Sequence, residues 1–178
     1  MLVALLMLTG ACQTREEVSS NPPDLSEIPD HESWNATLTT TQEGVVTSKI
    51  HYGHMQRFSG KRIVKFLEGV QIALYNSEGE HVADVRADKA VLNEVSQRIE
   101  LTDSVVVRAA SGMTLSTEKL VWDQRSDHLS SDVYVRVVTA EEDTIHGVGF
   151  DSDRNLDNWT IRKPWGVTRV APNATTQP

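Results

Sequence analysis

Cysteine, proline and positive charge are all scarce in this chain of 178 residues. Cys12 is the only cysteine, so no disulfide can form within the chain. The six prolines lie within residues 22–29 and 164–178, which leaves residues 30–163 without a residue that would interrupt a β-sheet. Lys and Arg number 17 against 25 Asp and Glu, a net charge of −8. That charge argues against nucleic acid as a partner, and against docking on anionic headgroups through charge alone.

Patterns typical of enzymes and metal sites are missing as well. The six histidines are scattered, and His51 and His54 lie three residues apart in a predicted strand, where they would not share a face. No cysteine or acidic cluster completes a zinc-binding set, and no serine lies in a nucleophile-elbow pattern. Residues 147–149, Gly-Val-Gly, lack the strand-to-helix context of a phosphate loop and are interpreted as a bulge in a strand. We therefore expect no enzyme, no metal site and no cofactor.

The N-terminus carries a continuous apolar run, MLVALLMLTGA, in residues 1–11. A membrane-spanning helix needs about 20 apolar residues, so this run is too short to span and instead suits a secretory signal. With Cys12 directly after it, the segment resembles a bacterial lipoprotein signal, although Thr9 stands where leucine is usual and no Lys or Arg precedes the run. We expect a lipid-modified Cys12 and a flexible, proline-containing tether over residues 12–35. The alternative is a buried free cysteine.

A repeated pattern organises the middle of the chain. In residues 82–107, apolar side chains recur at every second position on both sides of a polar stretch at 93–97, which predicts two strands joined by a turn. Residues 115–137 repeat this pattern about thirty residues later, and residues 47–72 carry a weaker copy. Self-similarity of this kind indicates one supersecondary unit stacked on its neighbours, and here the unit is a β-hairpin.

Strand-like units and turns alternate through the rest of the chain with no run at helical period, so the predicted fold class is all-β. Gly53 and Glu68–Gly69 are predicted to bend strands. Residues 36–170 are expected to form one elongated antiparallel β-sandwich built from repeated hairpins, and residues 171–178 a disordered tail. Stacked hairpins leave an open sheet edge at each end, and open edges recruit other strands. We therefore expect partners at those edges.

The organising stretch resembles a known family. Residues 85–92, VRADKAVL, and residues 99–107, IELTDSVVV, resemble the LptC family, the periplasmic, membrane-anchored components of the lipopolysaccharide exporter. Residues 115–123, LSTEKLVWD, resemble the family's second strand pair. The motifs are shared with the soluble bridge protein LptA of the OstA-like superfamily, but the tether and the anchor favour LptC. Many relatives are anchored by a transmembrane helix, whereas this chain offers Cys12.

The resemblance implies a twisted β-jellyroll with an apolar groove that holds the acyl chains of lipopolysaccharide. It also implies docking on an inner-membrane ABC transporter of the LptB/LptF/LptG type at one end and on an LptA-like bridge protein at the other. The protein would then be a passive carrier in the periplasm, anchored in the inner membrane, with no catalytic residues. Apolar burial contributes about 25 cal/mol per Å² and needs no positive charge.

One apolar face supplies the candidate groove. Its residues are Val64, Phe66, Val70, Ile72, Leu74, Val105, Val107, Leu120, Trp122, Val133 and Val135. Tyr52 and Trp159 can be assigned either to this face or elsewhere. The same residues could instead form a filled core in a structural or adhesive envelope lipoprotein. A third possibility, a hydrolase of envelope glycans, would need an acidic pair such as Asp88 and Asp123 in one cleft.

Overall fold

The computed structural model describes residues 28–168, and the regular secondary structure of that part of the chain is entirely β-strand, as the alternating pattern predicted. The strands are β1 (His31–Gln42), β2 (Val45–Phe58), β3 (Ile63–Tyr75), β4 (His81–Ala87), β5 (Lys89–Asn93), β6 (Arg98–Ala109), β7 (Thr114–Asp123), β8 (His128–Val138), β9 (Thr144–Asp153) and β10 (Trp159–Thr168). Between residues 28 and 168 there is no helix long and apolar enough to cross a membrane.

One antiparallel sheet contains all ten strands, and their order along the sheet follows the order in the chain. β4 and β5 are the exception, because both pair with β3 on one side and with β6 on the other. They therefore act as one strand that is interrupted at Asp88. β1 and β10 stand at the two ends of the order, and each has a single neighbour in the described chain. The result is a ladder of strands with an open edge at each end.

Most of the strands bend near their middles, along a line of β-bulges that we call the corner. The extra residues are Glu68 and Gly69 on β3, Asp103 and Ser104 on β6, and Asp132 and Val133 on β8, facing Gly53, Glu118 and Gly149 on neighbouring strands. Bulges bend a strand and increase its twist. Backbone hydrogen bonds connect the bends, since Gly69 N–H donates to the Asp88 carbonyl (3.1 Å) and Asp88 N–H to that of Asp103 (3.0 Å).

Gly53 shows how tightly the backbones approach one another at the corner. A Cβ atom at this position would lie 2.5 Å from the Glu68 carbonyl oxygen and 2.8 Å from the Glu68 Cβ. Glu68 itself has a φ of +60° and Gly69 a φ of +87°, so the bend predicted at this dipeptide is confirmed as a left-handed bulge. The bulge predicted around Gly149 is also present, but its extra residues lie on β8 and Gly149 faces them.

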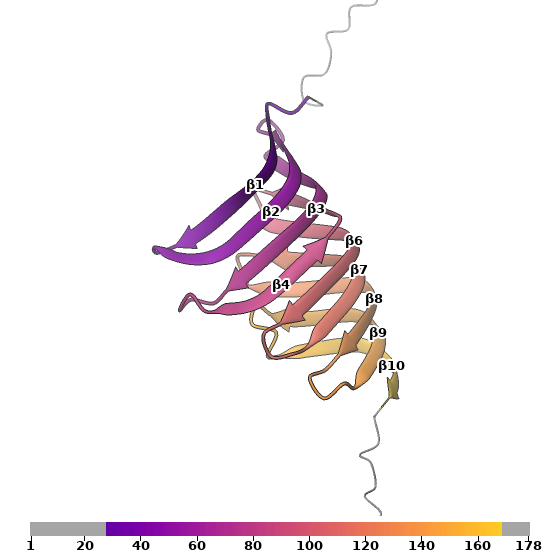
Figure 1. Ribbon diagram of the computed structural model, residues 1–178. Coiled ribbons are helices and arrows are strands. Elements are labelled where there is room, and N and C mark those ends of the chain that lie inside the picture. Colours follow the sequence, from indigo (N-terminus) through magenta and orange to yellow (C-terminus); the bar gives the residue numbers. More distant parts are fainter. Residues whose placement is uncertain (1–27, 169–178) are drawn as a thin grey trace, which may run out of the picture.

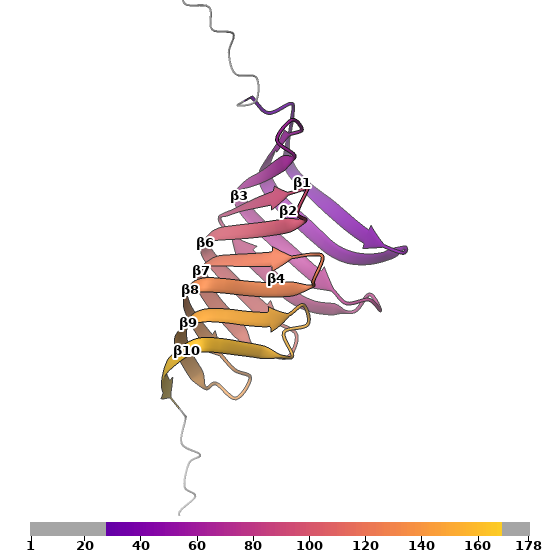
Figure 2. The same cartoon turned by 180° about the vertical axis from the view of Figure 1, so that it is seen from behind.

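The corner divides the ladder into two walls that face each other (Figures 1 and 2). The β4 wall contains β4, residues 70–75 of β3, residues 105–109 of β6 and the strand halves beyond them. The β5 wall contains β5, residues 63–67 of β3, residues 98–102 of β6 and their continuation. Each strand half runs from the corner to a turn, so two rows of turns line the opposite side. We call that side the mouth.

The boundaries expected from the sequence differ at the N-terminal end. β1 begins at His31, within the segment assigned to the tether, rather than at residue 36. Most β1 side chains are exposed, and a strand with exposed side chains can be as polar in composition as a linker. The backbone of β1 nevertheless pairs with β2 along its length. The signal segment 1–11, Cys12 and the tail 171–178 lie outside the described residues.

Candidate functional site

The space between the two walls is filled by one continuous apolar cluster. All of the candidate groove residues except Val133 belong to it, with exposed fractions of 7% or less. The β5 wall contributes side chains such as Leu120 and Trp122, and the β4 wall contributes Val107 and Val135. The alternating pattern therefore placed these residues on the inner faces correctly. It did not reveal that most strands contribute one half to each of the two walls.

Val133 is the exception among these residues. It is half-buried and does not join the interior cluster, because it is one of the two bulge residues on β8. Glu68 of β3 and Asp103 of β6 occupy the corresponding bulge positions on their strands. The strand turns at this point, so Val133 lies outside the interior cluster although its position continues the alternation of the inner face. Period-two alternation cannot show such a turn, because the parity of the inner positions is the same before and after it.

Several interior residues were not among the candidates, although they follow the same alternation. They are Ile50, Ala90, Ile99, Leu101, Leu115, Leu129, Val137 and Phe150. Cross-strand neighbours join both sets, since Ile99 pairs with Trp122, Leu101 with Leu120, and Val107 with Leu115.

The two undecided aromatic residues differ in position. Tyr52 is buried in the interior, and its hydroxyl lies 3.0 Å from the Ser33 hydroxyl of β1. Trp159 is half-buried at the start of β10, where its ring is stacked on Phe150 at the margin of the cluster. Tyr52 therefore belongs to the inner face, whereas Trp159 lies at its border.

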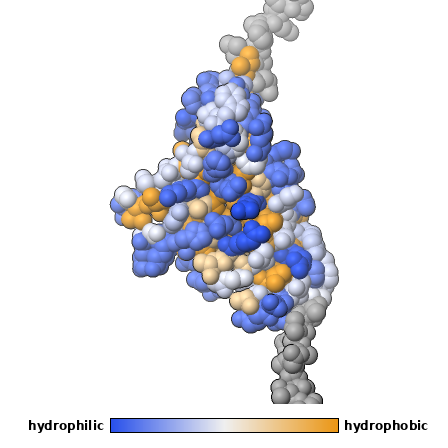
Figure 3. Space-filling model, viewed as in Figure 1, coloured by the Kyte–Doolittle hydropathy of each residue, from blue (hydrophilic) through white to orange (hydrophobic). Residues whose placement is uncertain are grey.

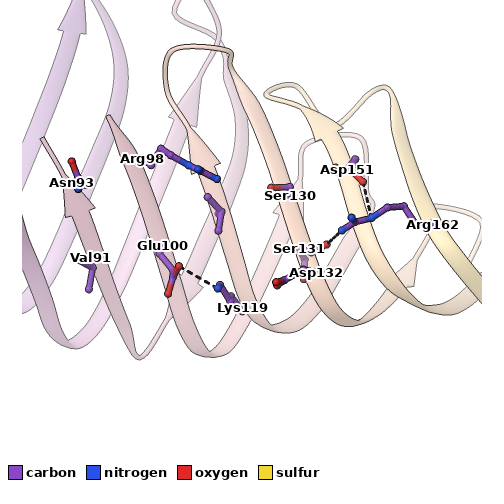
Figure 4. A pocket seen from close by; sticks show the side chains of 11 residues that line it. Val91, Asn93, Arg98, Glu100, Lys119, Ser130, Ser131, Asp132, Asp151 and Arg162 are labelled. Atoms are coloured by element: carbon purple, nitrogen blue, oxygen red, sulfur yellow. Dashed lines mark hydrogen bonds and ion pairs between the residues drawn. The ribbon is translucent and has the colours of Figure 1, made fainter. Parts of the chain in front are cut away.

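The outward faces of the walls are polar. The face of the molecule drawn in Figure 3 is largely hydrophilic, with smaller hydrophobic patches among the hydrophilic residues. A cavity of about 590 Å³ lies on the outer face of the β5 wall (Figure 4). Its lining holds three cationic and three anionic side chains, four of which form two pairs: Lys119 lies 3.3 Å from Glu100, and Arg162 lies 3.1 Å from Asp151. Arg162 also donates to the Ser131 carbonyl. Because cations and anions alternate there and neutralise one another, this outer cavity offers no concentrated charge to a ligand.

The carboxylates considered for hydrolysis do not share a cleft. Asp88 lies exposed at the corner, whereas Asp123 ends β7 at the mouth side of the β5 wall. Desolvation acts to raise the pKa of Asp123, but the backbone N–H groups of Ser126 and Arg125 outweigh it and the pKa is lowered. The Asp123 carboxylate therefore caps the turn between β7 and β8. Within residues 28–168, no group of three or more His, Cys, Asp or Glu side chains could hold a metal ion.

Both open edges carry an exposed tryptophan paired across the strands with a histidine. Trp34 of β1, 58% exposed, lies opposite His54, and the two rings stack with centroids 4.9 Å apart. Trp165 of β10, 50% exposed, lies opposite His146, with the Tyr134 ring 5.9 Å away. Exposed large aromatic side chains beside unpaired strand edges are typical of protein–protein interfaces. No periodic signal in the sequence marked these two positions.

Comparison with known proteins identifies one family. The family model described as "Lipopolysaccharide-assembly, LptC-related" matches residues 1–162 of the chain. This match includes every described strand up to the first residues of β10, and also the N-terminal segment. No curated protein matches the chain.

Proposed function

Because this chain belongs to the LptC family, whose general role is lipopolysaccharide transport, we propose that it binds lipopolysaccharide through the acyl chains and passes it to a partner. The acyl chains would lie between the β4 and β5 walls, against the interior cluster. The observation that carries this proposal is the apolar interior itself, which is bounded by two walls joined at the corner and bordered by turns at the mouth.

Apolar burial supplies the binding energy in this proposal. Each buried methylene group contributes about 0.8 kcal/mol, so one chain of about twelve carbons could gain up to roughly 10 kcal/mol. The net charge of −8 does not oppose binding of this kind. The interior side chains Leu74, Val107 and Leu115 are 0% exposed, so acyl chains can enter only if the two walls move apart at the mouth. The corner is then the hinge about which the walls open.

The two edge strands are the proposed docking sites for protein partners. β1 and β10 each have one unpaired side in the described chain, and a partner strand can add to such an edge through main-chain hydrogen bonds. We assign one edge to an inner-membrane ABC transporter of the LptB/LptF/LptG type and the other to an LptA-like bridge protein. Trp34 and Trp165 stand beside these edges and would supply buried aromatic anchors.

The family is periplasmic and membrane-anchored, and we propose Cys12 as the anchor of this member. Acyl groups on Cys12 would hold the chain in the inner membrane, since two or more acyl chains bind a bilayer durably. Residues between Cys12 and β1 would then separate the walls from the membrane surface.

Site-specific photo-crosslinking in cells tests the carrier function. A photoreactive residue at Val107 should give a lipopolysaccharide adduct, because Val107 lies on the inner face of the β4 wall. The control at Val106, its half-buried neighbour on the opposite face of the strand, should give none. If Val107 and its inner-face neighbours give no adduct in a folded, anchored protein, the interior is a permanently filled core and the protein is a structural lipoprotein.

A further inference from the structure

A second cavity, of about 460 Å³, lies at the mouth, between the β1–β2 hairpin and three turns of the β5 wall. Thr40, Thr41 and Gln42 approach from the hairpin, and Gln97, Arg125 and Arg154 from the turns. Trp122, a member of the interior cluster, also lines this mouth cavity. The mouth cavity therefore adjoins the space proposed for acyl chains.

The mouth cavity concentrates positive charge in an acidic protein. Its lining contains two arginines and no carboxylate, although the whole chain has a net charge of −8. Arg125 is held in place by a hydrogen bond from its guanidinium to the Val95 carbonyl, at 2.6 Å. The Arg154 guanidinium lies 5.5 Å from the centre of the Trp122 ring and 3.1 Å from an Asp127 carboxylate oxygen. An incoming anion would compete with Asp127 for only part of that guanidinium.

Two N–H donors at the mouth cavity have no hydrogen-bond partner among residues 28–168. Trp122 Nε1 is buried without a hydrogen bond, in a side chain that is 2% exposed. Arg154 Nε is buried and unpaired as well. A buried donor that lacks an acceptor costs stability, and both groups can only donate. An atom that satisfies either group has to be an acceptor, and beside two guanidinium groups an anionic oxygen fits best.

We propose that the mouth cavity is a subsite for a phosphate group on the head of an amphiphile whose acyl chains lie between the walls. This inference rests on the proposed function. A phosphate offers several acceptor oxygens, which suit two guanidinium groups together with the hydroxyl and amide groups of Thr40, Thr41 and Gln97. It also explains how a strongly acidic protein accepts a phosphorylated lipid: the attraction is local, at the point where the head leaves the interior.

Isothermal titration of the full-length protein tests this subsite with three probes: phosphorylated lipid A, the same lipid A after removal of its phosphates, and inorganic phosphate. The wild type should bind the phosphorylated lipid at least about tenfold more tightly than the dephosphorylated one. In the double variant Arg125→Gln, Arg154→Gln that ratio should fall to nearly one. Arg108→Gln, an exposed arginine on the outer face of the β4 wall, should leave the ratio unchanged. A purely structural loss would weaken both lipids equally and would not move the ratio.

The remaining outcomes overturn specific steps of the inference. Equal binding of the two lipids by the wild type would refute the phosphate subsite and leave the acyl-binding interior standing. If inorganic phosphate binds tightly when no lipid is present, the cavity is a site for free phosphate, and its assignment to a lipid head is refuted. If neither lipid binds, the proposed function itself fails and the subsite fails with it.

Discussion

Replacing Gly53 by alanine tests whether the corner depends on close backbone approach. The added Cβ would lie 2.5 Å from the Glu68 carbonyl oxygen, 2.8 Å from its Cβ and 3.2 Å from its carbonyl carbon. Non-bonded carbon contacts are optimal at about 3.5–4.0 Å, so β3 must move by roughly 1 Å relative to β2. Backbone atoms form two of the three contacts, so rotation of a side chain cannot relieve the overlap.

The magnitude follows from two opposing effects. Overpacking of this kind costs about 1–3 kcal/mol, whereas alanine in place of glycine gains about 0.4–1 kcal/mol by restricting the unfolded chain. We expect Gly53→Ala to lower the free energy of unfolding by about 1.3 kcal/mol, the difference between the middles of these two ranges, which corresponds to a Tm lower by roughly 3–6 °C for a domain of this size. Urea unfolding followed by circular dichroism measures the first quantity, and calorimetry the second.

Gly60 offers a matched control in the turn between β2 and β3. A Cβ at Gly60 would meet no atom within 4 Å, so Gly60→Ala should be neutral or stabilise by up to about 1 kcal/mol. If Gly53→Ala and Gly60→Ala unfold at the same urea concentration, close approach at Gly53 does not constrain the corner and the geometric argument is refuted.

Two further predictions concern the interior and the first edge strand. Leu120→Ala should lower the free energy of unfolding by about 2–5 kcal/mol because Leu120 is 0% exposed, whereas Val121→Ala, on the outer face of the same strand, should cost less than about 1 kcal/mol; similar urea midpoints would contradict the assignment of inner and outer faces. Hydrogen bonds donated by Gln56 and His54 lower the pKa of Glu32 from its usual value near 4.5, so its stabilising effect is present above that value and is lost as the pH falls through the lower folded-state pKa. The Tm difference between wild type and Glu32→Gln should therefore shrink from pH 6 to pH 3, and a difference that is constant with pH would show that the carboxylate does not fasten β1 to β2.

The sequence was sufficient to predict most of the strands, because their inner faces follow period two; the start of β1 at His31 is the exception. The polar turn at 93–97 lies where the composition indicated, and the bend at Glu68–Gly69 is present. These features depend on side chains that are near neighbours along the chain. A bend that contains glycine is also visible in the sequence, because glycine adopts a positive φ at little cost.

The sequence predicted a β-sandwich, but most of the positions at which its strands cross from one wall to the other could not be predicted in the same way. Asp103 and Ser104 also have positive φ, but they stand in a run, LTDSVVV, whose alternation continues on both sides of them. The mouth cavity was equally hidden, because the hairpin at Thr40–Gln42 meets Arg154 across more than a hundred residues of chain. Neither the unpaired indole N–H of Trp122 nor the cluster of two arginines has a signal at any fixed spacing.

The corner explains how a repeat of about thirty residues produces an interior rather than a flat sheet. Most strands cross both walls, so a single strand such as β6 places Leu101 on one side of the interior and Val107 on the other. Adding a hairpin lengthens the interior without changing its cross-section. A partner strand that pairs with β1 or β10 would need only the same bend to extend both walls. Under the proposed function, a lipid can then pass between proteins without leaving an apolar surface, provided that the corner continues across the paired edge.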